Sequence, residues 1–188
     1  MSELSDATVV ARVLSGDREA FGTLVDRHQD RMLAYVRHMG FGPDEASDIV
    51  QDGFVRAFRH LGRCGDPERF DGWLFRIVSN LCRTAGGRAK RKRTDALEDH
   101  APSLASELPG PDERMEGSWT RQRVREGLDG VPADQREALI LMYLEGYSVA
   151  EIEEVTGASR SAVKMRLKRG RDVLERLLAP VFAEVEDR

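Results

Sequence analysis

Cysteine is scarce in this chain, and patterns that bind metals or perform catalysis are missing. Only two of the 188 residues are cysteines, Cys64 and Cys82, and neither belongs to a CxxC motif or a cysteine–histidine cluster. The four histidines are scattered, and no glycine-rich phosphate loop is found. We therefore predict no metal site, no cofactor and no enzymatic activity. Both thiols are expected to be reduced, as in a cytoplasmic protein.

Aromatic residues and long apolar runs are also few. Aromatic residues make up 6% of the chain and charged residues 33%, a balance that suits helices with one solvated face better than a sheet sandwich. No stretch approaches the roughly 20 apolar residues of a membrane span. The N-terminus lacks the basic start and apolar run of a signal peptide. We expect an all-α, soluble, cytoplasmic protein without membrane insertion.

Charge is divided into blocks, although the net charge is only −4. Residues 83–93 contain six basic residues and no acid, whereas residues 95–118 contain seven acids, one arginine and three prolines. Such an acidic, proline-containing segment cannot bury enough apolar surface to offset its ordering entropy. We predict a flexible acidic linker at residues 94–118, between an N-terminal domain (1–93) and a C-terminal domain (119–188).

The N-terminal domain has the apolar spacing of a bundle of about four helices. Ser5 and Asp17 are placed to cap the first two helices, and Pro43 begins the third. The fourth helix follows a short loop and leads into the basic block. Two adjacent glycines, Gly86 and Gly87, are expected to end or loosen that helix before its basic tail.

The third helix has two contrasting faces, which separate at about 100° per residue. One face is apolar and is expected to face the core: Val50, Phe54, Ala57, Phe58 and Leu61. The opposite face is acidic: Asp44, Glu45, Asp48, Gln51 and Asp52. The acidic face is either a docking surface or a solvated one.

The C-terminal domain carries the pattern of a helix-turn-helix in SVAEIEEVTGASRSAVKMRLKRGRDVLERLL. Ser148 and Glu151 fit a capping box for a short first helix. Gly157 interrupts that helix, and Ser159 can cap a second one that runs to about Leu178. A short scaffold helix, a tight turn and a longer presented helix are therefore predicted.

The second of these helices divides into an apolar and a basic sector. Val163, Leu167 and Gly170 share a sector expected to pack on the scaffold helix, and the adjacent sector is basic: Arg160, Lys164, Lys168 and Arg171. Most charged helix faces are merely solvated. Here the twelve residues 160–171 contain no acid, whereas ordinary exposed helices mix signs. The pattern favours a helix that enters the DNA major groove.

Three segments together resemble a known family. SDIVQDGFVRAFRHL, WLFRIVSNLCR and VPADQREALILMYLEGYS, the last followed by the helix-turn-helix, resemble the two domains of a bacterial RNA polymerase sigma factor of the extracytoplasmic-function (ECF) type, in the sigma-70 family. The resemblance covers about residues 6–178, excepting the linker. A free-standing helix-turn-helix regulator is the main alternative, but it leaves the acidic helix and the segment around Trp73 unexplained.

The resemblance implies a subunit that binds core RNA polymerase and directs promoter-specific initiation. The N-terminal domain would bind and help melt the −10 element, and the C-terminal domain would bind the −35 element as duplex. The partners it implies are promoter DNA, the clamp helices of the largest polymerase subunit, the polymerase flap and an anti-sigma factor. The linker resembles the family's segment that threads toward the RNA exit path, although a plain tether would have the same composition.

The resemblance also implies site residues. For the −35 element these are Ser159, Arg160, Ser161, Lys164, Arg166, Lys168, Arg169 and Arg171. We expect Arg160, Ser161, Lys164 and Lys168 near base edges, and Arg166, Arg169 and Arg171 nearer phosphates.

Two further sets belong to the N-terminal domain. For the −10 element they are Trp73, Arg76, Asn80, Arg83, Arg88, Lys90 and Arg91, and for core polymerase Asp48, Gln51 and Asp52. The loop at residues 62–69 resembles the one that receives a flipped base. A core role for Trp73, and a buried or capping role for Asn80, stay open.

Overall fold

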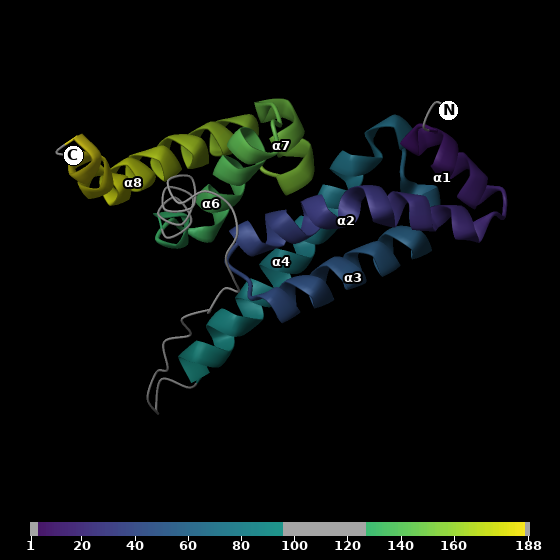
Figure 1. Ribbon diagram of the computed structural model, residues 1–188, viewed down its shortest axis with the longest axis horizontal. Coiled ribbons are helices and arrows are strands. Elements are labelled where there is room, and N and C mark those ends of the chain that lie inside the picture. Colours follow the sequence, from purple (N-terminus) through teal and green to yellow (C-terminus); the bar gives the residue numbers. More distant parts are fainter. Residues whose placement is uncertain (1–3, 96–126, 187–188) are drawn as a thin grey trace. The chain divides into compact units, whose positions relative to one another are not determined.

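The computed structural model describes residues 4–95 and 127–186, with side chains described for residues 4–87 and 127–179 (Figure 1). The chain forms two compact units, one built on α1 to α4 and the other on α6 to α8. Regular secondary structure in the described residues is entirely helical, which confirms the all-α prediction. Among these residues no helix combines the length and the hydropathy that a membrane crossing requires.

The N-terminal unit follows the predicted bundle. Its elements are α1 (Asp6–Leu14), η1 (Arg18–Ala20), α2 (Phe21–His38), α3 (Pro43–Arg59), η2 (Leu61–Arg63), η3 (Pro67–Arg69) and α4 (Phe70–Asp95). Ser5 caps α1 by accepting a hydrogen bond from the Thr8 N–H, and Asp17 accepts one from the Ala20 N–H. Both caps were predicted, because a capping side chain and its donor lie within one turn of sequence.

The core of this unit is built from aromatic and aliphatic side chains between α2, α3 and α4. Tyr35 and Phe75 are both fully buried, and their rings meet edge to face with centroids 5.2 Å apart. The helices α3 and α4 approach closely at Gly53, where a Cβ would lie 2.8 Å from Val78 Cγ2. The apolar face of α3 is buried as predicted, except that Phe58 is 37% exposed.

Helix α4 corrects one prediction. It passes through Gly86 and Gly87 without interruption and ends at Asp95. A glycine inside a helix costs about 1 kcal/mol relative to alanine, which the good helix formers in this segment can offset. Of the predicted linker at residues 94–118, only the two residues that end α4 lie within the described chain.

The C-terminal unit contains the predicted helix-turn-helix. Its elements are α6 (Ala133–Leu139), the π-helical turn η4 (Ile140–Leu144), α7 (Val149–Thr156) and α8 (Arg160–Glu186). Ser148 and Glu151 form both bonds of the capping box. Gly157 ends α7 with a left-handed backbone (φ 70°), and Ser159 accepts a hydrogen bond from the Ala162 N–H at 3.4 Å.

Helix α8 differs from the prediction in its length and in its packing. It continues past Leu178 and through Pro180. Proline disfavours a helix interior, partly because it removes a helical hydrogen bond. The residues around Pro180 favour helix strongly enough to offset that loss. Helix α8 also packs closely against α6, a neighbour that the prediction did not name. A Cβ at Gly170 would lie 3.0 Å from Leu139 Cδ1.

Candidate nucleic-acid and polymerase interfaces

The first turns of α8 present the predicted cations to solvent. Every residue predicted to contact the −35 element is exposed, except Arg166, which is half-buried: Ser159, Arg160, Ser161, Lys164, Lys168, Arg169 and Arg171. On the same helix Val163 and Leu167 are buried. One side of α8 is thus committed to the unit's core, and the other is available to a partner.

Two of the three expected phosphate contacts already have neighbours within the C-terminal unit. Arg166 Nε lies 3.2 Å from Asp134 Oδ2 of α6, and Arg171 Nη1 donates to the Tyr143 hydroxyl at 3.4 Å. Tyr143 belongs to the π-helical turn and is 59% exposed. These contacts orient both guanidinium groups before any DNA is bound.

A buried arginine that was not predicted from the sequence supports the packing of α8 on α6. Arg136 of α6 donates through Nη2 to the carbonyl oxygens of Asp129 (2.7 Å) and Val131 (3.2 Å), and through Nη1 to Asp129 Oδ1 (3.1 Å). Burial lowers the pKa of the Arg136 guanidinium, while the Asp129 carboxylate opposes that shift. Arg136 therefore holds the turn that precedes α6, the helix on which α8 packs.

The loop between α3 and α4 is built around a buried cysteine. Cys64 is 8% exposed, and its thiol donates to the Asp66 carbonyl oxygen, 3.6 Å away. Burial raises the pKa of the Cys64 thiol. The Asp66 side chain accepts from the Glu68 N–H and so caps η3. The loop is thus ordered by its own side chains, and its exposed positions include Gly65 and Glu68.

Helix α4 arranges the predicted −10 residues along successive turns. Trp73 is half-buried, with its ring centroid 6.0 Å from that of Phe70, whereas Arg76 and Asn80 are exposed. Trp73 is therefore not a fully enclosed core residue, and the Asn80 side chain is not buried. Arg83 Nη2 donates to the Ser79 hydroxyl at 2.7 Å. The side chains of Arg88, Lys90 and Arg91 lie outside the described part.

The acidic face of α3 is exposed over its whole length. It consists of Asp44, Glu45, Asp48, Gln51 and Asp52. Asp52 pairs with Arg56 one turn along the helix, at 2.9 Å. The carboxylates of this face remain accessible to the cations of a partner.

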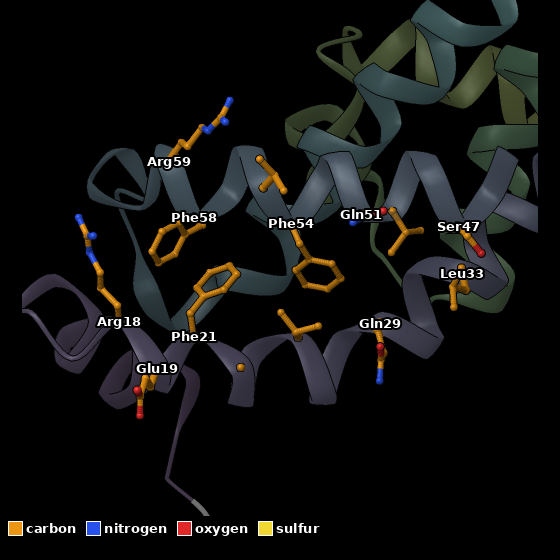
Figure 2. A pocket seen from close by; sticks show the side chains of 14 residues that line it. Arg18, Glu19, Phe21, Gln29, Leu33, Ser47, Gln51, Phe54, Phe58 and Arg59 are labelled. Atoms are coloured by element: carbon orange, nitrogen blue, oxygen red, sulfur yellow. The ribbon is translucent and has the colours of Figure 1, made fainter. Parts of the chain in front are cut away.

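An apolar groove of about 920 Å³ adjoins that face, between α2 and α3 (Figure 2). Figure 2 shows Phe54 and Phe58 of α3 pointing toward Phe21 of α2, with ring centroids 6.4 and 5.1 Å from that of Phe21. Gln51 also lines the groove, and Figure 2 shows Arg18 and Arg59 at one end of it. The groove could not be predicted from the sequence, because the helical spacing of Phe58 indicates a core position.

These features define a two-unit helical protein with a cationic helix-turn-helix and a separate acidic helix face. The family model described as "Sigma-70 region 2" matches residues 24–93, and "Sigma-70, region 4" matches residues 121–174. The chain is also 33% identical, over 176 residues, to the ECF RNA polymerase sigma factor SigM of Mycobacterium tuberculosis. That alignment covers 94% of this chain and 86% of SigM. The chain therefore belongs to the ECF sigma factors of the sigma-70 family.

Solved structures agree with this assignment. The structure of CnrH in complex with the cytosolic domain of CnrY is similar with a TM-score of 0.66 and 31% identity, covering 93% of this chain and 97% of CnrH. The sigma factor RpoE of Bartonella quintana, solved with the anti-sigma factor NepR, has a TM-score of 0.67 at 24% identity, covering 85% and 96% of the two chains, and supports the fold. As a sigma factor, the protein binds core RNA polymerase and directs it to promoters; sigma factors are not enzymes as a family.

Proposed function

We propose that three surfaces divide the work of initiation in this sigma factor. The exposed side of α8 binds the −35 duplex, the loop at residues 62–69 with α4 binds and opens the −10 element, and the acidic face of α3 binds core polymerase. The observation that carries this proposal is the segment 160–171, where six cations and no acid lie on a helix whose other side is buried. The chain performs no catalysis of its own and acts in the cytoplasm.

In this proposal promoter melting is driven by binding energy. Extruded bases stack or hydrogen-bond on the −10 surface, and no nucleotide is hydrolysed. The surface consists of the loop together with Trp73, Arg76, Asn80 and Arg83, and the basic tail with Arg88, Lys90 and Arg91 adds salt-sensitive phosphate contacts. The predicted boundaries at residues 93 and 119, with an acidic tether between them, allow the two promoter elements to be contacted independently.

The decisive experiment is transcription in vitro with core polymerase, with genome-wide sequencing of the start sites. We expect starts that share a −35 and a −10 element, and this result would supply both promoter sequences. Random initiation, or none above that of core polymerase by itself, would contradict the proposed function.

On α8, a matched pair of variants separates base readers from phosphate contacts. Lys164→Ala should weaken binding of the matched −35 duplex more than binding of random duplex, because base edges carry the sequence. Arg169→Ala should weaken both equally, because phosphates are the same in every sequence. The salt slope of log K should fall by about 1 for Arg169→Ala. Equal losses for Lys164→Ala on both duplexes would remove it from the base readers.

On α3, we propose that Asp48, Gln51 and Asp52 contact the clamp helices of the largest polymerase subunit, and that the adjoining groove takes an apolar side chain beside them. Asp48→Arg should reduce affinity for core polymerase by about tenfold or more, since it replaces attraction by repulsion. The control is Asp30→Arg, an exposed acid on α2. Equal losses from both variants would indicate only a long-range charge effect.

We further propose that an anti-sigma factor regulates this chain. The CnrH structure contains the cytosolic domain of CnrY, and the RpoE structure contains an anti-sigma factor. The chain purified from its own cells without an inducing stimulus should carry a stoichiometric protein that displaces core polymerase. Recovery with core polymerase under every condition would contradict this regulation.

A further inference from the structure

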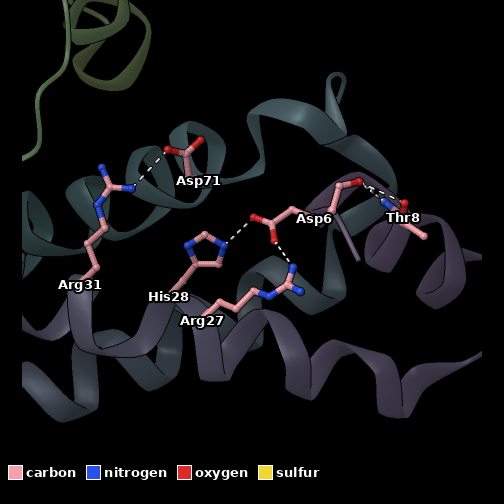
Figure 3. A network of polar contacts seen from close by, with 7 residues as sticks. Asp6, Thr8, Arg27, His28, Arg31 and Asp71 are labelled. Atoms are coloured by element: carbon pink, nitrogen blue, oxygen red, sulfur yellow. Dashed lines mark hydrogen bonds and ion pairs between the residues drawn. The ribbon is translucent and has the colours of Figure 1, made fainter. Parts of the chain in front are cut away.

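A single carboxylate ties the start of α1 to the middle of α2. Asp6 Oδ1 accepts from Arg27 Nη1 at 2.9 Å, and Asp6 Oδ2 lies 2.6 Å from His28 Nε2 (Figure 3). His28 is only 9% exposed, and Asp6 and Arg27 are half-buried. An ionised carboxylate can only accept hydrogen bonds, so the hydrogen of the His28 contact is on Nε2. We call these three residues the α1 clasp.

The clasp matters for the loop because α1 lies against that loop. Helix α1 contacts both of its short helical turns, η2 and η3. Leu14, at the end of α1 away from Asp6, lies next to the loop: a Cβ built on Gly62 would lie 4.0 Å from Leu14 Cδ2. The residues that fix α1 therefore also fix one wall of the loop at residues 62–69.

His28 also reaches the other end of the loop. Its ring centroid is 5.5 Å from that of Phe70, the first residue of α4, which is fully buried. Phe70 in turn contacts the Trp73 ring at 6.0 Å. A second bridge, between Arg31 Nη1 of α2 and Asp71 Oδ2 at 3.4 Å, joins the same two helices one turn further on (Figure 3).

We propose that Asp6 and His28 are positioning residues for promoter opening. They touch no DNA; they hold the loop and Trp73 in the arrangement that captures the bases of the −10 element. Asp6 acts through α1, and His28 acts through both Asp6 and Phe70. This inference rests on the proposed −10 role of the loop and of Trp73.

The test uses complete holoenzyme on a promoter taken from the start-site experiment, with 2-aminopurine in the −10 element to report base unstacking. Asp6→Asn removes the charge and keeps the shape of the side chain. We expect it to slow open-complex formation by about tenfold, the effect of losing a charge-assisted hydrogen bond. Affinity for core polymerase and for duplex promoter in the closed complex should stay unchanged.

Two replacements of His28 separate its two contacts. His28→Gln keeps a donor close to the place of Nε2 and should retain most of the opening rate. His28→Phe keeps a ring against Phe70 but loses the bond to Asp6, so it should open as slowly as Asp6→Asn. Rescue by Gln and not by Phe supports the clasp, whereas equal rates for the two variants overturn its hydrogen bond as the cause.

The control is Arg12→Gln, which breaks the exposed pair with Asp17 near the other end of α1. It should open promoters at the wild-type rate. An Asp6→Asn variant that opens normally overturns the inference. The inference is also overturned if Asp6→Asn lowers the affinity for core polymerase, the affinity for duplex promoter and the thermal stability together with the rate of promoter opening. That result would show only a role in folding.

Trp73→Ala distinguishes the failure of this inference from the failure of the proposed function. If Trp73→Ala opens promoters normally, the proposed −10 surface is wrong and the clasp has nothing to position. If Trp73→Ala is slow while Asp6→Asn is not, the −10 surface stands and only the positioning role is lost.

Discussion

Each of the two units of this sigma factor is stabilised internally by a different kind of contact. In the N-terminal unit, aromatic rings meet edge to face in the core, and the half-buried Asp6 bridges α1 to α2. The C-terminal unit also has an interhelical bridge, from Asp134 of α6 to Arg166 of α8, so the two units differ chiefly in their cores. The described core of the C-terminal unit is mainly aliphatic, with buried side chains such as Leu139, Ile140 and Val163; the Arg136 side chain is also buried.

The difference matches the tasks proposed for the two units. Contacts between aromatic rings have preferred geometries, so they fix the positions of the core side chains closely. Capture of an unstacked base requires a pocket with that degree of order. Aliphatic packing carries no such direction. A single helix that lies in a groove and finds its register through phosphates requires less directional order in the core behind it.

The largest effect is expected from the aromatic core of the N-terminal unit. Phe75→Ala should lower the free energy of unfolding of that unit by about 3–5 kcal/mol, because it removes a fully buried ring and leaves a cavity beside Tyr35. Hydrogen exchange of peptides from each unit measures this. Exchange should accelerate in α2 to α4, while α6 to α8 should keep their protection. Equal acceleration in both units would show that they unfold together and would end the comparison.

A smaller loss of stability is expected when Arg136, the buried arginine of the C-terminal unit, is replaced. Arg136→Lys keeps the charge but cannot bond Asp129 and Val131 through two nitrogens of one planar group. The unit should lose about 2 kcal/mol, the effect of hydrogen bonds lost from a charged donor. Hydrogen exchange in α6 and α8 measures it, and affinity for the −35 duplex should fall in parallel. An unchanged exchange rate would mean that aliphatic packing is sufficient for this unit.

The glycines at the two helix crossings allow a direct comparison of packing. Gly53→Ala should destabilise the N-terminal unit by about 1–3 kcal/mol, because the new Cβ would lie 2.8 Å from the branched Val78. Gly170→Ala meets the more flexible Leu139 at 3.0 Å and should cost less. Gly86→Ala, which meets no atom within 4 Å, is the control and should stabilise α4 by about 0.5–1 kcal/mol. A larger loss of stability from Gly170→Ala than from Gly53→Ala would show that the helix crossing in the C-terminal unit is the more rigid of the two.

Local features of this fold could be predicted from the sequence. The caps at Ser5, Asp17, Ser148 and Ser159 involve residues within one helical turn, so short patterns contain all the information. The division of α8 into a buried and an exposed side follows from its periodicity for the same reason.

Contacts between distant residues could not be predicted in this way. The clasp joins residues 21 and 22 positions apart, and nothing in a local pattern pairs Asp6 with His28. Arg136 is buried where it bonds the carbonyl oxygens of Asp129 and Val131, and these contacts exist only in the folded chain. Phe58 has the spacing of a core residue, yet its exposure depends on how far α2 covers it. The passage of α4 through Gly86 and Gly87 depends on the summed propensity of a long segment.

The smallest effect concerns Cys64, whose thiol reports on the order of the loop. Because the thiolate is the reactive form and burial raises the thiol pKa, alkylation of the native chain should begin at higher pH than alkylation of the denatured chain. Mass spectrometry of the Cys64 peptide across pH 7–10 measures this, and Cys64→Ser should leave promoter activity nearly unchanged. If the clasp holds the loop, Asp6→Asn should move the alkylation profile back toward lower pH, whereas Arg12→Gln should not. A native profile equal to the denatured one would show that the loop opens freely, and the N-terminal unit would then lack the order that distinguishes it from the C-terminal unit.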